Sequence, residues 1–180
     1  MKPKPKIPPE IQPDPIPLPE RHHVDAAVGW LMLGSARDAS EELARLPKAV
    51  AQRLEVLELR WETHSGLRDW EEAFRVATLQ VTLFPDAVSG WLHRAYAARR
   101  MARGGVAQAA AYLGPAAARF PMEPLVRYNL ACYSAVQGDP ETAWIWFCKA
   151  LAVGQPVELR RMALADPDLE PIWPRIAVEA

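Results

Sequence analysis

The segment YNLACYSAVQGDPETAWIWFCKAL, residues 128–151, decides the fold of this chain. Its apolar residues recur at helical spacing on both sides of Gly138, and Asp139-Pro140-Glu141 follows directly. Asp caps the free amides of a helix, Pro is tolerated in the first turn, and Glu favours the positive end of the helix dipole. The stretch therefore predicts a helix, a turn at Gly138, and a second helix that begins near Pro140.

Three small residues of this stretch have counterparts 34 residues earlier in the chain. The matched pairs are Gly104 with Gly138, Ala109 with Ala143, and Ala116 with Ala150. A fixed period of 34 with small residues at constant places indicates a helix–turn–helix unit that stacks on copies of itself. Such arrays bury a continuous core between neighbouring units and present extended binding surfaces.

On these residues the chain resembles the tetratricopeptide-repeat (TPR) family. Leu130 and Ala131 match the large and small pair of that family's first helix, and Phe147 matches an apolar position of its second helix. The resemblance covers about 21–157 and is closest over 90–151. It implies an all-α, TPR-type right-handed superhelical array of antiparallel helix pairs, with about eight to nine helices.

The resemblance divides the chain into a tail, four units and a capping helix, at about 1–20, 21–53, 54–87, 90–123, 124–157 and 158–177. Two units depart from the family pattern. Trp61 stands where a small residue is usual, so its packing on the next helix must differ. Pro115 predicts a kink or break near Gly114 in the third unit, whose large and small pair is Tyr96-Ala97.

Residues 1–20 hold eight of the eighteen prolines. Because proline fixes φ and removes a backbone donor, this segment predicts a disordered, polyproline-II-like tail with little packing. Helical periodicity begins at Val24. The basic tip formed by Lys2, Lys4 and Lys6 allows weak contact with a membrane surface, and the alternative is a solubilising or linking tail.

Composition excludes several classes of protein. The net charge is −1, so no global field attracts nucleic acid. No apolar run approaches the roughly 18 residues that span a bilayer, and the charged N-terminus lacks the apolar region of a signal peptide, so we expect a cytoplasmic protein. The two cysteines, Cys132 and Cys148, are too few for a disulfide framework and are expected to be buried thiols.

The sequence carries no recognisable catalytic motif. It has no P-loop, no dinucleotide-binding fingerprint and no nucleophile elbow. Its one histidine pair, His22-His23, would point about 100° apart on a helix and forms a poor metal site. We therefore expect no enzyme activity, no metal and no cofactor.

The resemblance implies a protein-binding groove on the concave face, lined by the first helix of each unit. The groove positions carry Glu55, Glu58, Glu62, Trp91, Arg94, Met101, Tyr128 and Asn129, with Leu125 and Cys132 on the same face. The glutamates also fit a plain solvated face, and the preceding loop could bury Trp91. Asn129 stands where the family commonly binds a peptide backbone. We expect Arg94 and Tyr128 to anchor the partner, since aromatic and Arg side chains carry most interface energy.

The leading functional hypothesis is a non-catalytic adaptor or scaffold that binds a partner protein in this groove. The carboxylate clamp of chaperone-binding relatives is absent, because Glu62, Ala98 and Ala95 occupy its positions. The chain is also similar in size and repeat number to the bacterial kinesin light chain that accompanies bacterial tubulins, which makes a filament-associated protein the alternative. A regulatory subunit of an enzyme is a weaker alternative. The sequence leaves the partner and the oligomeric state open.

Overall fold

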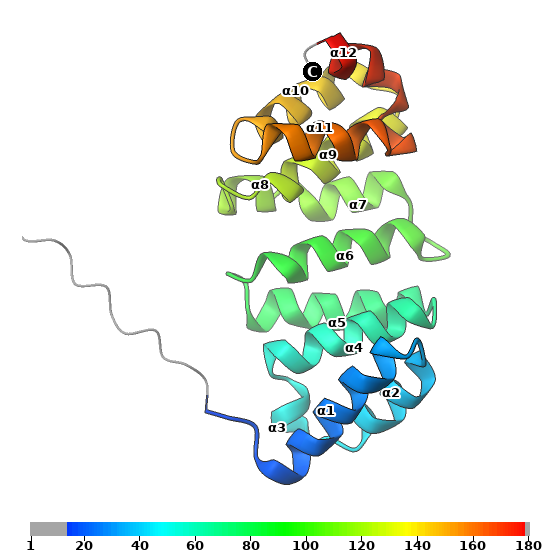
Figure 1. Ribbon diagram of the computed structural model, residues 1–180, viewed down its shortest axis with the longest axis vertical. Helices are drawn as coiled ribbons and strands as arrows, with labels where there is room; N and C mark the ends of the chain where they lie inside the picture. The colour runs from blue at the N-terminus through cyan, green and yellow to red at the C-terminus, as the bar shows by residue number, and fades with distance from the viewer. Residues whose placement is uncertain (1–13, 179–180) are drawn as a thin grey trace, which may run out of the picture.

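The computed structural model describes residues 14–178, and within them the chain forms helices and no strand (Figure 1). This confirms the all-α prediction. The helices are α1 (Leu18–Met32), α2 (Ala36–Ala44), α3 (Lys48–Ala51), α4 (Leu54–Gly66), α5 (Trp70–Leu83), α6 (Val88–Arg100), α7 (Val106–Leu113), α8 (Ala116–Arg119), α9 (Pro124–Val136), α10 (Pro140–Leu151), α11 (Pro156–Leu164), the 3-10 helix η1 (Pro167–Ile172) and α12 (Trp173–Val178).

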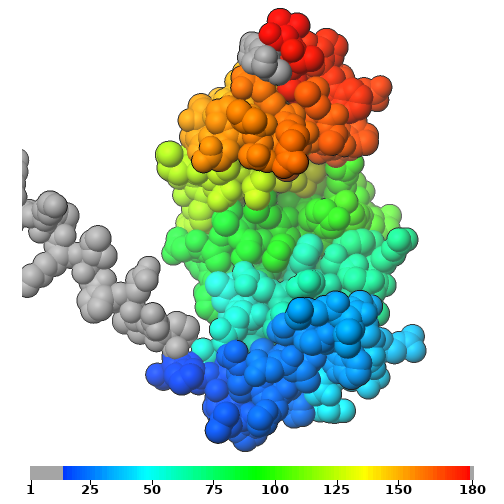
Figure 2. Space-filling model, in the orientation of Figure 1, coloured from blue at the N-terminus to red at the C-terminus, as the bar shows by residue number. Residues whose placement is uncertain are grey.

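The longer helices pack as successive pairs along one stack. Helix α1 packs on α2, α4 on α5, α6 on α7, and α9 on α10, and further contacts join α2 to α4, α5 to α6, and α7 to α9. The space-filling view shows the same order as bands that run from blue at the N-terminal end to red at the C-terminal end (Figure 2). Each pair therefore covers the apolar face of the next pair.

The turn between α9 and α10 is stabilised by the residues that predicted it from the sequence. The Asp139 carboxylate accepts a hydrogen bond from the Thr142 amide at 2.9 Å, and Pro140 occupies the first turn of α10. Gly138 has a φ of +83°, a conformation that residues with a Cβ rarely adopt. Asp69 caps α5 in the same way, through the Glu72 amide at 3.2 Å.

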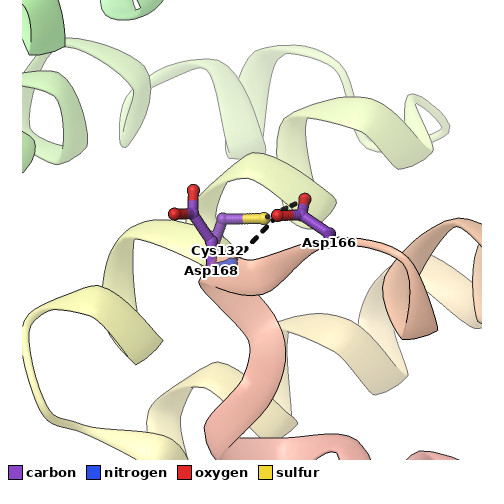
Figure 3. Close-up of side chains that lie close together, drawn as sticks. All are labelled: Cys132, Asp166 and Asp168. Atoms are coloured by element: carbon purple, nitrogen blue, oxygen red, sulfur yellow. Dashed lines mark hydrogen bonds between the residues drawn. The ribbon is translucent and has the colours of Figure 1, made fainter.

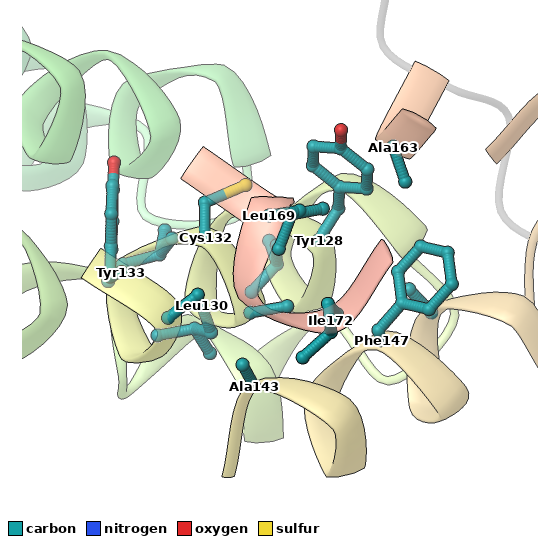
Figure 4. Packing of buried hydrophobic residues seen from close by; sticks show 14 of the residues in the cluster. Tyr128, Leu130, Cys132, Tyr133, Ala143, Phe147, Ala163, Leu169 and Ile172 are labelled. Carbon is teal, nitrogen blue, oxygen red and sulfur yellow. The ribbon is translucent and has the colours of Figure 1, made fainter. Parts of the chain in front are cut away.

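The main core lies in the C-terminal half of the stack. Ala143, Phe147 and Ala150 are fully buried, and Leu130 and Ala131 of α9 pack with them. The close-up shows Ile172 beside Phe147 and Leu169 beside Tyr128, and both Ile172 and Leu169 come from η1 (Figure 4). A second, smaller cluster joins α1 to α4 and includes Ile16.

The start of the folded part differs from the sequence prediction. The tail was expected to extend to residue 20, but α1 begins at Leu18 and Ile16 is buried in the N-terminal cluster. Pro19 does not prevent the helix because the first turn needs no amide donor. Residues 1–13, which include Lys2, Lys4 and Lys6, lie outside the described part of the chain.

Three further features bear on the sequence predictions. The helix break expected at Pro115 is present, since α7 ends at Leu113 and α8 begins at Ala116. Tyr96, at the large position of the third unit, is 38% exposed and lies outside the core. The expected single capping helix is replaced by α11, η1 and α12, and residues 156–178 are called the cap below. Pro167 and Pro171 explain the change, because proline does not continue a regular α-helix.

Gly104 provides a direct test of the close packing at the turn after α6. A Cβ placed on this glycine would lie 1.9 Å from the carbonyl oxygen of Ala98, so the backbone would have to move. We expect Gly104→Ala to lower the free energy of unfolding by about 1–3 kcal/mol, as overpacking does. Urea denaturation followed by circular dichroism measures the change.

The matched control is Gly29→Ala in α1, where an added Cβ meets no heavy atom within 4 Å. Because alanine favours helix more than glycine, this variant should gain about 0.5–1 kcal/mol. If both variants behave alike, the proposed close approach at Gly104 is wrong.

Candidate functional site

The three glutamates of α4 face solvent to different degrees. Glu55 is exposed and forms an ion pair with Arg53 at 3.1 Å. Glu58 is half-buried and accepts a hydrogen bond from the Ser89 hydroxyl of α6 at 2.8 Å. Glu62 is exposed. Glu58 thus helps to join neighbouring helix pairs, while the other two carboxylates are exposed and Glu55 is paired with Arg53.

Trp91 and Arg94 lie together, but both make contacts within the fold. The Arg94 guanidinium lies 5.0 Å from the ring centroids of both Trp91 and Tyr112, and it donates to the Tyr112 carbonyl at 3.3 Å. The Trp91 ring nitrogen donates to the Pro85 carbonyl at 3.0 Å, and its ring packs on the main core. Burial lowers the pKa of Arg94. Half-buried Met101 follows α6 and lies outside this cluster.

Tyr128 borders the surface that the sequence predicts, but the side chain is almost entirely buried. Only 5% of its surface is exposed, and its hydroxyl donates to Asp166 Oδ2 at 3.0 Å. The cap folds back over α9 and covers it. Asn129 remains partly exposed next to it, and its amide donates to the Leu125 carbonyl of the same helix at 2.8 Å. Tyr128 therefore holds the cap in place.

Two carboxylates of the cap connect it to the repeats (Figure 3). Asp166 accepts from Tyr128, from the Cys132 thiol at 3.5 Å and from the Asp168 amide at 3.0 Å. Asp168 forms a two-bond ion pair with Arg99 of α6, one bond of which is 2.8 Å long. This hydrogen bonding raises the pKa of Arg99. The ion pair links the third helix pair to the cap across 69 residues of sequence.

Cys132, Asp166 and Asp168 lie close enough to suit a metal ion, with ligand atoms within 4.8 Å of one another. Their chemistry fits hydrogen bonding better. Burial raises the pKa of the Cys132 thiol, and the neighbouring carboxylates raise it further, so the thiol keeps its proton and donates to Asp166. Asp168 is already neutralised by Arg99. We assign these three residues to the attachment of the cap.

An open hollow of about 290 Å³ lies between α6, α9 and the cap. This α6–α9 hollow is lined by Tyr96, Arg99, Arg100, Leu125, Tyr128, Asn129, Cys132, Tyr133, Met162, Asp166 and Asp168. Leu125 and Met162 also border a second hollow of about 460 Å³ between α9 and α11. The two depressions therefore share Leu125 and Met162, which form the apolar end of the α6–α9 hollow.

The hollow has two cationic side chains, and Asp168 pairs with one of them, Arg99. The other, Arg100, has no carboxylate partner within residues 14–178. Its guanidinium lies 3.4 Å from the Tyr96 ring centroid and 5.5 Å from that of Trp70, and it donates to the Tyr96 carbonyl at 3.1 Å. The rings and the hydrogen bond fix its position while leaving it exposed. Sequence reasoning missed Arg99-Arg100, although two adjacent arginines at the end of a groove-lining helix were visible.

A larger hollow of about 580 Å³ lies between α8, α9 and α10 on another part of the surface. It is lined mostly by small aliphatic residues, together with Arg127, Trp146 and Lys149. Lys149 lies over the Trp146 ring at 4.4 Å. This hollow offers fewer polar groups that could orient a ligand, so volume alone does not make it the better candidate.

Trp61 stacks flat on His93, with ring centroids 3.9 Å apart, and its edge meets Tyr96. This is the altered packing expected where a large residue replaces a small one. His93 Nδ1 also lies 3.2 Å from Gln80 Oε1. Burial lowers the pKa of His93 to about 4.

The pKa of His93 predicts a loss of stability in mild acid. In the unfolded chain a histidine takes up a proton near pH 6.5, whereas folded His93 stays neutral down to about pH 4. Protonation therefore favours the unfolded state, and stability should fall from about pH 6.5 toward pH 4. Urea denaturation at intervals across this window should show a steeper loss in the wild type than in His93→Gln. The exposed His22→Gln serves as the control, and a wild-type slope in His93→Gln would contradict the assignment.

Among the residues described, no helix has both the length and the apolar character to cross a membrane.

Comparison with known proteins identifies the architecture. No protein-family model matches the sequence, and no curated protein matches it. Among solved structures, the chain is similar to TTC0263, a thermophilic TPR protein of Thermus thermophilus, with 18% identity and a TM-score of 0.62 over 89% of this chain and 96% of that one. It is also similar to MamA (MSR-1 C2), with 17% identity and a TM-score of 0.61 over 80% of this chain and 78% of that one. At these identities the likeness concerns the fold.

Proposed function

We propose that this chain, which has the tetratricopeptide-repeat fold, is a non-catalytic interaction module that binds a partner protein at the α6–α9 hollow. The observation that carries the proposal is the position of Arg100, held by two aromatic rings at the edge of an open depression. Repeat arrays commonly use such extended surfaces for binding. Arg and Tyr are also the side chains that most often dominate the energy of an interface.

The chemistry of the hollow favours binding over catalysis. Its potential nucleophile, Cys132, is a buried thiol with a raised pKa, and a buried thiol of this kind is inert. Asp166 and Asp168 are both engaged in hydrogen bonds or ion pairs. What remains open is a set of side chains that recognise surfaces, namely Tyr96, Arg100, Leu125, Asn129 and Met162.

The proposed site revises the roles of the residues expected to line the groove. Asn129 stays in the binding surface, while Tyr128 and Arg94 support the fold from within. Glu55 and Glu62 form a separate exposed acidic zone on α4, and charges at such a rim chiefly affect association rates. Arg94→Ala and Tyr128→Ala would therefore disturb packing as well as any binding.

Position-specific photo-crosslinking tests the proposal. A photoreactive amino acid at Asn129, in the hollow, should capture a partner protein from extracts of the source cells. The same group at Ile145, exposed on α10, serves as the matched control and should not capture it. Capture from Ile145 alone would contradict the proposal. The identity of the captured protein distinguishes an adaptor's client from a tubulin-like filament or an enzyme that this chain regulates.

A further inference from the structure

Two adjacent arginines of the hollow differ in whether a carboxylate neutralises them. Arg99 is neutralised by Asp168 of the cap, through two hydrogen bonds. Arg100 lines the same hollow and has no carboxylate partner within residues 14–178. Its guanidinium is nevertheless held by Tyr96 and Trp70, so its donors are fixed before any ligand arrives. A planar guanidinium fixed in this way matches the geometry of a carboxylate.

Two exposed apolar side chains form the other end of the hollow. Leu125 is 42% exposed and Met162 is 39% exposed, and the two side chains border both depressions. They provide a place for one apolar side chain next to the charged end. The Met side chain adapts to different shapes, because it is unbranched and flexible.

The chain already packs an acidic and apolar segment of its own cap against α6 and α9. In the cap, Asp168 pairs with Arg99 while the next residue, Leu169, is fully buried against α9. Helices α6 and α9 can therefore bind a segment in which a carboxylate pairs with an arginine and the adjacent leucine is buried. Arg100, Leu125 and Met162 offer the same combination of charge and apolar surface in the hollow, and within residues 14–178 no carboxylate pairs with Arg100.

We propose that the α6–α9 hollow recognises an acidic segment of a partner protein, with a carboxylate on Arg100 and an adjacent apolar side chain between Leu125 and Met162. This inference rests on the proposed function and names the class of partner. The Asn129 side chain also lines the hollow, where its amide donates to the Leu125 carbonyl. Binding depends on charge and therefore weakens as salt is added.

The test uses labelled peptides of defined sequence and the complete chain. Ten-residue peptides that alternate Asp or Glu with Leu are compared with peptides that carry Lys in place of each acidic residue, and fluorescence anisotropy measures the affinity. We expect the acidic peptides to bind and the basic ones to fail. Arg100→Gln should weaken binding about tenfold or more, as expected for loss of a charge-assisted hydrogen bond. Arg103→Gln is the matched control, since Arg103 is an exposed arginine three residues away and outside the hollow.

Three outcomes would overturn the inference. These are equal binding of acidic and basic peptides, unchanged affinity in Arg100→Gln, and binding of a single-stranded oligonucleotide in place of the peptides. Circular dichroism shows whether Arg100→Gln keeps its fold, and Arg100→Lys provides a second variant that retains the charge but loses the fork geometry. If the peptides fail while Asn129 still captures a protein by crosslinking, the acidic class is wrong and the proposed function stands. If capture occurs only from Ile145, the proposed function is wrong.

Discussion

Replacing Phe147 by alanine is expected to lower the free energy of unfolding by about 3–5 kcal/mol, the usual range when a buried phenylalanine is removed. Phe147 is fully buried and lies where α9, α10 and η1 meet, with Tyr128 at 6.3 Å and Trp144 at 6.0 Å between ring centroids. The cavity would disrupt the repeat and the cap together. Urea denaturation followed by circular dichroism measures the loss.

The control for this variant is Ile145→Ala on the same helix. Ile145 is 53% exposed, so its truncation should change the stability by about 0.5 kcal/mol or less. Comparable losses in the two variants would show that the face of α10 that packs inward has been assigned wrongly.

Replacing Leu169 by alanine is expected to cost about 2–4 kcal/mol and to release the cap from α9. Leu169 is fully buried in η1 and packs in the main core. Loosening the cap would uncover the Cys132 thiol, which the cap holds in contact with Asp166. Both chains carry Cys148→Ser, so that a thiol reagent reports on Cys132 alone. The reagent should modify Cys132 much faster in the chain with Leu169→Ala than in the chain with Leu169.

The exposed Glu170→Ala, next in the sequence, is the control for this experiment. It should leave both the stability and the reaction rate of Cys132 close to those of the parent chain. If Cys132 reacts rapidly in the parent itself, the cap does not cover α9 as described.

The sequence was most informative where one residue type satisfies a local requirement. Gly138 supplies a positive φ, Asp139 caps α10, and Pro115 interrupts a helix, and each of these effects acts within a few residues. The resemblance to tetratricopeptide repeats added the order of the pairs, and the similar solved structures confirm that fold.

The candidate site was harder to predict because it depends on contacts between distant segments. Tyr128 has the spacing of a groove residue, but it is covered by a cap that lies 38 residues further along the chain. Helical periodicity could not show that Asp166 and Asp168 would return to α6 and α9. Tyr96 stands at the large position of its unit, yet it is partly exposed and meets the ring of Trp61 at an edge.

Radical footprinting of the purified complex shows whether the partner protein binds at the α6–α9 hollow. Tyr96 and Tyr112 are matched reporters, since 38% and 37% of their surfaces are exposed, but only Tyr96 lines the hollow. Binding of the partner identified by crosslinking should protect Tyr96 and Met162 from oxidation and leave Tyr112 unchanged. Protection of Tyr112 with unchanged oxidation of Tyr96 and Met162 would contradict the account.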